Sequence, residues 1–218
     1  MGGQDQEIVI TAFSERFLAA YPKVGALEGG FVNDPLDRGG ATNHGVSLRF
    51  LIAEGKIDVD ADGIADFDLD MDGDIDVADI RKLSKIDAMY LFQRCFWNRL
   101  DCESFPRPIG EMLFDQGVNG GNVAAKKLLQ RAINRVLARF PGMSFRDGVG
   151  VLDDDGGIGE LTRAALDWVL KLPAAGMPAL VQAYRDEAAQ RYRGIVARNP
   201  SQRRFLDGWL RRARELGK

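Results

Sequence analysis

The sequence is poor in histidine and cysteine, since its 218 residues include one histidine, His44, and two cysteines, Cys95 and Cys102. A single imidazole argues against histidine-based nucleophilic triads and multi-histidine metal sites, so carboxylates must carry any catalytic chemistry. Two cysteines permit one disulfide but do not require it. No apolar run reaches the roughly 18 residues of a membrane-spanning helix, which excludes such a helix.

The segment 27–46 is rich in groups that carry chemistry and reads LEGGFVNDPLDRGGATNHGV. Glu28 closes a segment with helical periodicity, which a pair of glycines then ends. At a helix C-terminus the macrodipole disfavours ionisation, so we expect a raised pKa for the Glu28 carboxyl, as a general acid requires. Turn-forming residues further on predict a short hairpin that returns Asp37 and Thr42 toward Glu28. Paired carboxyl groups are typical of enzymes that hydrolyse glycosidic bonds.

A larger part of the chain resembles a known family. The string EGGFVNDPLDRGGATNHGVS resembles the signature of the glycoside hydrolase family 108 lysozymes, many of which are phage endolysins. Two further strings, IRKLSKIDAMYLFQRCFWNR at 80–99 and FDQGVNGG at 114–121, resemble later segments of that family. The resemblance implies hydrolysis of the β-1,4 bond between N-acetylmuramic acid and N-acetylglucosamine in bacterial peptidoglycan.

The same resemblance implies roles for individual residues. Glu28 would be the catalytic acid, and a similarity to related phage lysozymes implies that Asp37 and Thr42 position the attacking water. Asp34 competes with Asp37 for the role of second carboxylate. His44 fits either a substrate contact or a local structural role, and Asn119 fits either a substrate contact or a helix cap. The candidate substrate contacts are Asp34, Asn43, His44, Asp115 and Asn119, and Asp115 also fits the role of a salt-bridge or helix-cap residue.

An acidic run at residues 58–79 contains ten aspartates and no basic residue. Its carboxylates would repel one another without a partner, whereas Ca²⁺ prefers oxygen ligands at the spacing of an EF-hand loop. The downstream copy follows this spacing, resembles dockerin-type loops, and offers Asp68, Asp70, Asp72, Asp74, Asp76 and Asp79. The upstream copy, with Asp58, Asp60, Asp62 and Asp66, is either a degenerate partner or part of a second ion site. We expect one structural Ca²⁺ downstream, since a two-carboxylate glycosidase needs no metal for its proton transfers.

The charge is unevenly distributed along the chain. The net charge is −3 and the run 58–79 contributes −10, so the remainder carries +7. Residues 182–218 hold ten Lys or Arg against four Asp or Glu. They form either a docked terminal helix with a solvated arginine face or a peripheral contact to an anionic wall or membrane. No nucleic-acid motif accompanies this charge, so nucleic acid is not expected as a partner. The family resemblance implies bacterial peptidoglycan as the partner, and we expect the protein to be a monomer.

Helical periodicity dominates the sequence and strand signals are scarce. We therefore predict a mainly α, lysozyme-like helical fold with a small β-hairpin at the active site and the calcium-binding loop as an insertion. One catalytic domain is expected over 1–218, with the insertion at 58–79 and a peptidoglycan-binding-like helical lobe over about 110–200. In that lobe, DGGIG at 155–159 either resembles a peptidoglycan-binding motif or is a plain turn. The predicted helices cover residues 8–27, 79–99, 106–119, 122–140, 160–171, 177–197 and 201–216.

Two other functions remain open at this point. A lytic transglycosylase would use Glu28 without a second carboxylate and would leave an anhydro product. A non-catalytic module would bind the cell wall in a calcium-dependent way. The N-terminal MGGQDQEIVITAFSERFL lacks the pattern of a secretory signal. Together with the endolysin resemblance, this predicts synthesis in the cytoplasm of a host bacterium and action on the periplasmic wall after the membrane is permeabilised.

Overall fold

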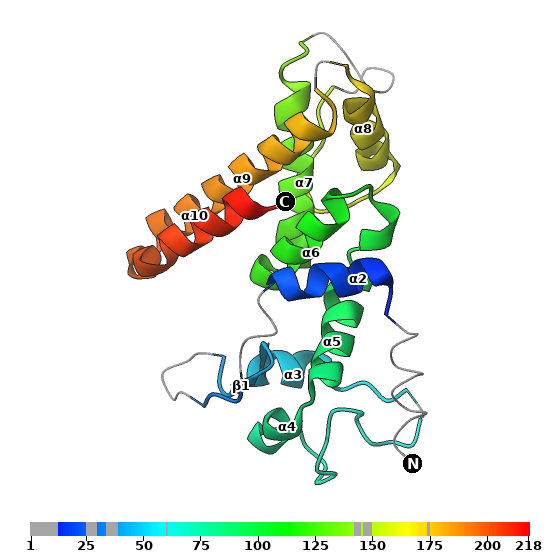
Figure 1. The fold of residues 1–218 in the computed structure, drawn as a ribbon, viewed down its shortest axis with the longest axis vertical. Coiled ribbons are helices and arrows are strands. Elements are labelled where there is room, and N and C mark those ends of the chain that lie inside the picture. Colours follow the sequence, from blue (N-terminus) through cyan, green and yellow to red (C-terminus); the bar gives the residue numbers. More distant parts are fainter. Residues whose placement is uncertain are drawn as a thin grey trace. The chain divides into compact units, whose positions relative to one another are not determined.

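The computed structural model describes residues 13–24, 30–33, 39–59, 61–141, 145, 150–173 and 175–218. The chain divides into two compact units, Met1–Arg99 and Leu100–Lys218 (Figure 1). Helices dominate the described part of both units, and a two-stranded antiparallel sheet lies in the first. The predicted mainly α fold with a small β-hairpin is therefore confirmed.

The first unit is built from short helices joined by loops. The segment 79–99, predicted to be helical, consists of separate helices, because the helix that begins in the acidic run ends at Lys82 and a new one starts after Ser84. The Ser84 hydroxyl accepts the backbone N–H of Asp87, and the Asp87 carboxylate accepts that of Ser84. This capping box satisfies N–H groups that a helix start otherwise leaves unpaired. The helices are α2 Glu15–Ala20, the 3-10 helix η1 Tyr21–Val24, α3 Leu48–Glu54, α4 Val77–Lys82, α5 Lys85–Phe92 and the π-helix η2 Gln93–Asn98.

An aromatic cluster forms the core of the first unit. Phe17 of α2 lies 5.5 Å from Tyr21 and 5.7 Å from Trp97 between ring centroids, and Tyr21 meets Phe92 edge-on at 5.5 Å. These side chains are at most 3% exposed. Each such pair contributes roughly 0.5–1.5 kcal/mol beyond the burial of its area. The cluster holds α2 and η1, which lead into the segment that carries Glu28, against α5 and η2.

A short hairpin follows in the first unit. Strands β1 Thr42–Asn43 and β2 Val46–Ser47 pair antiparallel, with Thr42 opposite Ser47. His44 and Gly45 form the turn with positive φ angles of 49° and 80°. Two-residue hairpin turns favour this left-handed conformation, which glycine adopts at little cost and other residues seldom adopt.

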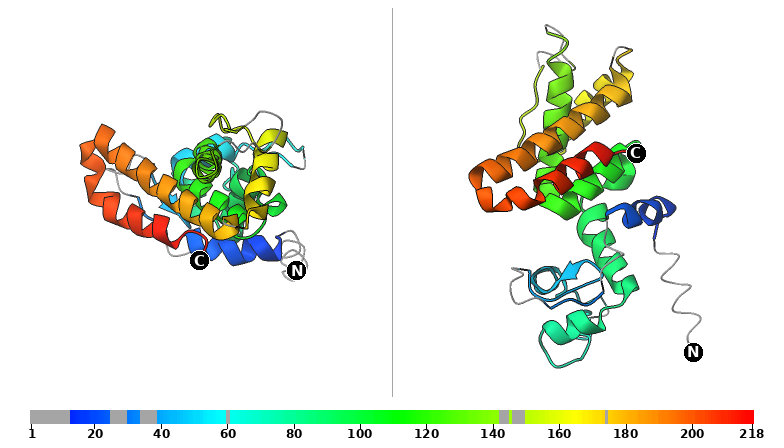
Figure 2. Two further views of the ribbon diagram at one scale, coloured as in Figure 1. Left: turned by 90° about the horizontal axis from the view of Figure 1, so that it is seen from above. Right: turned by 60° about the vertical axis from the view of Figure 1, so that its left-hand side comes forward.

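The second unit consists mainly of longer helices. The helices predicted at 106–119, 122–140, 160–171 and 177–197 are all present, whereas the segment predicted at 201–216 begins as a 3-10 turn. The long helices α9 and α10 run antiparallel and side by side (Figure 2), and α7 packs against α6 and α9. The helices are η3 Cys102–Ser104, α6 Ile109–Gly120, α7 Asn122–Leu137, α8 Glu160–Lys171, α9 Gly176–Arg198, η4 Pro200–Phe205 and α10 Leu206–Glu215.

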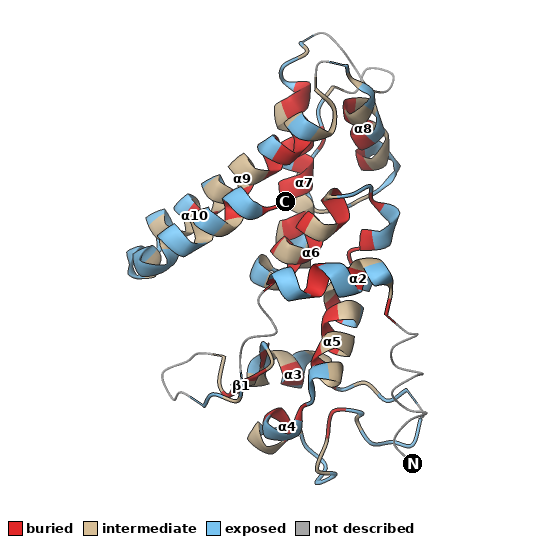
Figure 3. Ribbon diagram, in the orientation of Figure 1, coloured by how far each residue is buried: buried red, intermediate tan, exposed pale blue. Residues whose placement is uncertain are grey.

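Buried residues gather where α6, α7 and α9 of the second unit meet (Figure 3), and most of them are apolar. Leu113, Leu129, Ile133 and Leu180 are fully buried. Burying a side chain of this size contributes roughly 1.5–3 kcal/mol. The buried Tyr184 hydroxyl donates to the carbonyl of Ala125 at 3.2 Å, so its polar group is satisfied.

Cys95 and Cys102 form no disulfide with each other, and both are buried. Burial, with a smaller contribution from the Glu54 carboxylate, raises the pKa of the Cys95 thiol to about 11. A thiol with so high a pKa is a poor nucleophile. None of the helices in the described part of the chain is both long and apolar enough to cross a membrane.

Candidate active site and metal centre

The three carboxylates predicted to act in catalysis, Glu28, Asp34 and Asp37, lie outside the described residues. The structure does place Thr42, whose backbone exchanges two hydrogen bonds of 2.8 Å with Val32. The Thr42 hydroxyl donates to the carbonyl of Gly40 at 3.4 Å. The bridge between Val32 and Thr42 joins the two ends of the segment that contains Asp34 and Asp37.

Asn43, a predicted substrate contact, is buried and 5% exposed. Its Nδ2 donates to the carbonyl oxygens of Ile80 at 3.0 Å and Leu83 at 3.2 Å. Both acceptors lie at the C-terminal end of α4, where helical carbonyls lack partners within the helix. The side-chain amide therefore ties the hairpin to α4, and its substrate contact stays a prediction.

His44, the second predicted contact in the hairpin, is the first residue of the turn. Its side chain is partly buried, and Nδ1 has no hydrogen-bond partner among the described residues. The turn conformation gives this residue a local structural role. Its contact with substrate stays a prediction.

Asp115 and Asn119 lie on α6 in the second unit. The Asp115 carboxylate accepts hydrogen bonds from Nε of Arg212 at 3.0 and 3.1 Å and from Nε2 of Gln116 at 3.0 Å. The Asp115 side chain is 14% exposed, so this ion pair joins α6 to α10 in a largely desolvated place. The exposed Asn119 amide donates to the backbone carbonyl of Asp115 at 2.8 Å.

The downstream acidic loop has a defined backbone conformation. The Asp68 carboxylate accepts the N–H groups of Asp72 at 3.2 Å and Gly73 at 2.9 Å. Met71 and Gly73 have positive φ angles of 61° and 98°. The Asp72 carboxylate in turn accepts the N–H of Asp74 at 3.1 Å.

The upstream loop repeats this conformation ten residues earlier. Asp58 accepts the N–H groups of Asp62 at 3.2 Å and Gly63 at 3.0 Å, and Asp62 accepts that of Ile64 at 2.8 Å. Ala61 and Gly63 have positive φ angles of 60° and 89°. Of the predicted upstream ligands, Asp60 lies outside the described residues, and the carboxylate of Asp66 accepts the N–H of Val59 at 3.3 Å.

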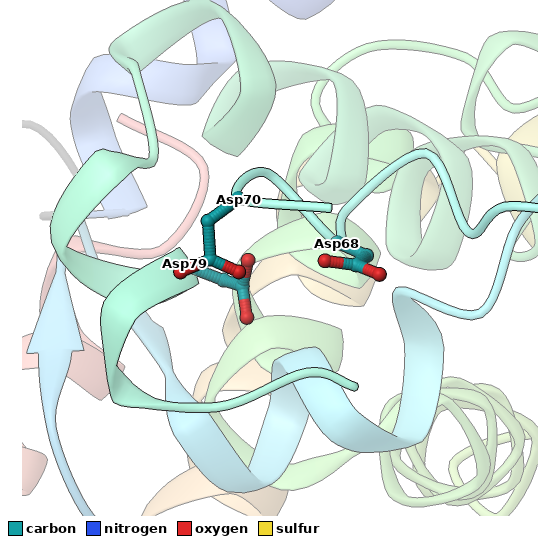
Figure 4. A group of neighbouring side chains, drawn as sticks. All are labelled: Asp68, Asp70 and Asp79. Atoms are coloured by element: carbon teal, nitrogen blue, oxygen red, sulfur yellow. The ribbon is translucent and has the colours of Figure 1, made fainter. Parts of the chain in front are cut away.

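Two carboxylate groupings in the downstream loop are close enough to share a cation. One carboxylate oxygen from each of Asp68, Asp70 and Asp79 lies within 4.8 Å of the others (Figure 4), and Asp74, Asp76 and Asp79 form a second such group. Asp79 is fully buried, and its two oxygens accept the N–H groups of Leu69 at 2.6 Å and Asp76 at 2.7 Å.

Asp70 is the carboxylate whose unpartnered oxygen most clearly calls for a bound cation. Its Oδ1 is buried and has no hydrogen-bond partner among the described residues. Desolvation, followed by the negative charges of Asp72 and Asp79, raises the pKa of the Asp70 carboxyl. A buried oxygen without a donor and an excess of negative charge fit a hard divalent cation with oxygen ligands.

The DGGIG segment of the second unit is held by a buried glutamine of α7. Gln130 is 1% exposed; its Nε2 donates to Asp155 and to the carbonyl of Gly157, both at 2.9 Å, and its Oε1 accepts the N–H of Gly156 at 2.8 Å. The Asp155 carboxylate also accepts the N–H of Gly157 at 2.7 Å. The polar groups of the loop and of Gln130 are thus hydrogen-bonded to one another, so a structural role explains much of the DGGIG motif. A cavity of about 480 Å³ lies beside the loop.

With the geometry described, the chain can be compared with known proteins. Residues 21–121 match the glycosyl hydrolase 108 family. Residues 124–214 match a second family, described as a Predicted Peptidoglycan domain. No curated protein matches the chain. Among similar solved structures, Brucella abortus SagA is 24% identical, with a TM-score of 0.57 and coverage of 93% of this chain and 96% of that one.

The likeness to SagA shows a shared fold, in agreement with the lysozyme-like, mainly α architecture. The two family matches support an enzyme that degrades or binds peptidoglycan. The first match ends at the close of α6, whereas the structural units divide after Arg99. Helix α6, with Asp115 and Asn119, therefore matches the hydrolase family in sequence and packs within the second unit.

Sequence reasoning did not identify three contacts that lie within the units: Asn43 with α4, Gln130 with its loop, and Arg212 as the ion-pair partner of Asp115. Gln130 did carry a signal, because a polar residue on the apolar face of an amphipathic helix is rarely buried without hydrogen bonds. The contacts of Asn43 and Arg212 join residues at least 37 positions apart in the sequence, and no local sequence pattern predicts them.

Proposed function

We propose that this protein is a lysozyme that hydrolyses the β-1,4 bond between N-acetylmuramic acid and N-acetylglucosamine in peptidoglycan. Glu28 would protonate the glycosidic oxygen as general acid. Asp37, with Asp34 as the competing candidate, would activate or orient the water, assisted by the Thr42 hydroxyl. The observation that carries the proposal is the match of residues 21–121 to a glycosyl hydrolase family, because that segment contains all four residues.

The position of Thr42 supports its part in this mechanism. Its backbone is held on one side by Val32 and on the other by Ser47, so the side chain projects from a fixed strand. A group that orients a reacting water has to be held in place, since a small displacement costs much of the rate. Thr42 also stands at one end of the segment with both candidate second carboxylates.

The test is the release of reducing sugar ends from purified peptidoglycan. Glu28→Gln should lower the rate by a factor of about 10² to 10⁴, because the general acid is lost. Glu103→Gln, an exposed change of the same kind in the second unit, should leave the rate unchanged. Asp37→Asn and Asp34→Asn, compared side by side, identify the second carboxylate by the larger loss. Full activity of a folded Glu28→Gln protein would refute the catalytic assignment.

Mass analysis of the released fragments separates the alternatives. A lysozyme gives products with a free reducing end, whereas a lytic transglycosylase gives 1,6-anhydro products that are 18 Da lighter because water is not added. A non-catalytic module would release nothing and would instead co-sediment with cell walls in a calcium-dependent way.

We also propose that the downstream loop binds one structural Ca²⁺. Asp68, Asp70 and Asp79 would hold it, with further oxygens from Asp72, Asp74 and Asp76. The buried, unpartnered Oδ1 of Asp70 and the raised pKa of its carboxyl support this assignment. A bound ion would neutralise mutual repulsion and stabilise the folded state by mass action. The repeated upstream conformation at Asp58 and Asp62 supports the proposal of a second site formed by Asp58, Asp60, Asp62 and Asp66.

A further inference from the structure

A basic pocket lies in the second unit between α7, α9 and the end of α10. Its volume is about 580 Å³, within the range of roughly 300–1,000 Å³ that is usual for small-ligand sites. One acidic side chain lines it, Asp186, and this carboxylate accepts a hydrogen bond from Gln182 at 2.9 Å. Five basic side chains line it: Arg135, Arg185, Arg193, Arg214 and Lys218.

Two of these five cations already have anionic partners. Arg135 binds Glu187 at 2.6 Å and the side-chain oxygen of Gln190 at 3.1 Å. Lys218 binds Glu215 at 2.8 Å. The positive charge of the pocket therefore rests mainly on the other three residues.

The remaining three guanidinium groups come from α9 and α10, which pack against each other and both line the pocket. Arg193 of α9 and Arg214 of α10 have no hydrogen bond or ion pair within the described part of the chain. The Glu215 carboxylate interacts electrostatically with Arg185 and Arg214, so Arg193 has the least compensated charge of the three. Nε of Arg185 donates to the carbonyl of Leu216 at 2.8 Å, which orients its guanidinium group. Planar guanidinium groups bind carboxylates through two parallel hydrogen bonds, and those bonds are stronger than neutral ones.

We propose that this pocket binds the free carboxylates of the peptide stems of peptidoglycan. The glycan strand offers hydroxyl and N-acetyl groups, whereas the peptide stems carry the carboxylates, so three arginines select the peptide over the sugar. The match of residues 124–214 to a Predicted Peptidoglycan domain covers the pocket apart from Lys218. This inference rests on peptidoglycan as substrate and adds the part of it that the second unit recognises.

The test uses the full-length protein and a stem tetrapeptide, L-alanyl-γ-D-glutamyl-meso-diaminopimelyl-D-alanine, in isothermal titration calorimetry. We expect saturable binding that weakens at least about tenfold when the peptide carboxylates are amidated, since charge-assisted hydrogen bonds are lost. Arg193→Gln with Arg214→Gln should weaken binding to a similar extent. The matched control is Arg203→Gln with Arg211→Gln, which removes the same charge from exposed sites outside the pocket.

Three results would overturn the proposal: absence of binding to the free peptide, an equal loss in both double variants, or equal binding of the amidated peptide. Inorganic phosphate serves as a competitor, and displacement of the peptide at equal concentration would reveal a nonselective anion site. Thermal unfolding of each variant confirms that it is folded. Hydrolysis is followed separately, so an inactive protein that still binds the peptide refutes the lysozyme proposal alone, and an active one that ignores the peptide refutes the pocket alone.

Discussion

The side-chain amide of Asn43 donates a hydrogen bond of 3.0 Å to the carbonyl oxygen of Ile80 and thereby connects the hairpin to α4. Asn43 follows Thr42 in β1, and α4 begins with a capping box in which Asp79 of the acidic loop takes part. One short helix therefore joins the loop proposed to bind calcium at its start and the hairpin at its end. A change in the conformation of the acidic loop would therefore act on the hairpin that contains Thr42 through the contacts of α4 with Asp79 and Asn43.

Replacement of this amide should destabilise the first unit. Asn43→Ala is expected to lower the free energy of unfolding by about 1–3 kcal/mol, because two buried carbonyl groups at the end of α4 lose their donor. Urea denaturation followed by circular dichroism measures the change. Asn98→Ala, an exposed change in η2, should stay within about 0.5 kcal/mol of the wild type. Similar losses in both variants would mean that the bonds from Asn43 contribute little.

Asp70→Asn should have opposite effects on stability with and without calcium. In the presence of EDTA the variant should unfold at the same or a higher temperature than the wild type, because burial and the charges of Asp72 and Asp79 disfavour an ionised Asp70. In excess calcium the order should reverse, since the wild type gains about 2.7 kcal/mol at 100 times the dissociation constant. Differential scanning calorimetry provides both comparisons.

Two controls sharpen this experiment. Asp153→Asn, an exposed change in the second unit, should show the same calcium-dependent rise in unfolding temperature as the wild type. Asp58→Asn should remove part of the shift only if the upstream loop holds a second ion. If calcium raises the unfolding temperature of Asp70→Asn as much as that of the wild type, Asp70 does not bind the ion.

The helices of the second unit could be predicted because their apolar residues recur at helical spacing along uninterrupted segments. The helix α8 Glu160–Lys171 coincides with its predicted bounds. The break after Lys82 was readable in principle, since Ser84 and Asp87 have the spacing of a capping box. The π-helix at Gln93–Asn98 has no comparable local signal, and its Phe96 and Trp97 pack against Phe50 and Phe17, which lie far away in the sequence.

The site was predictable to a smaller extent. Spacing alone anticipated the downstream carboxylate cluster, because all its carboxylates lie within twelve residues. The role of Asn43 depends on a partner that lies 37 residues away, and that partner could not be inferred from the hairpin sequence. The catalytic roles of Glu28 and Asp37 stay predictions for the experiments proposed above.

Asp155 should make the second unit sensitive to acid. Hydrogen bonds from the Gln130 amide and from the N–H of Gly157 lower the pKa of the Asp155 carboxyl. The folded state thus favours the ionised form, so the stabilisation is complete above the ordinary pKa of about 3.8 and disappears as the pH falls through the lower folded value. Asp155→Asn should therefore be less stable than the wild type at pH 6, and the difference should shrink below pH 4. Urea denaturation at several pH values tests this, and a difference that does not change with pH would contradict it.

The ion pair between Asp115 and Arg212 spans 97 residues and fastens α10 to α6. The two side chains are 14% and 26% exposed, so Arg212→Gln would leave a carboxylate in a largely desolvated place and should cost about 1–3 kcal/mol. Asp115→Asn should then cost less in the Arg212→Gln background than in the wild type, with a coupling energy above about 0.5 kcal/mol. Arg211→Gln, at the neighbouring exposed position, serves as the control.

The same pair of variants decides between the two roles of Asp115. If Asp115 acts only through Arg212, both single variants should lower peptidoglycan turnover to the same small degree, in proportion to their loss of stability. If Asp115 contacts the sugar, Asp115→Asn should raise KM while Arg212→Gln, at matched stability, does not. The comparison of KM at a temperature where both variants are fully folded therefore separates a substrate contact from a structural tie.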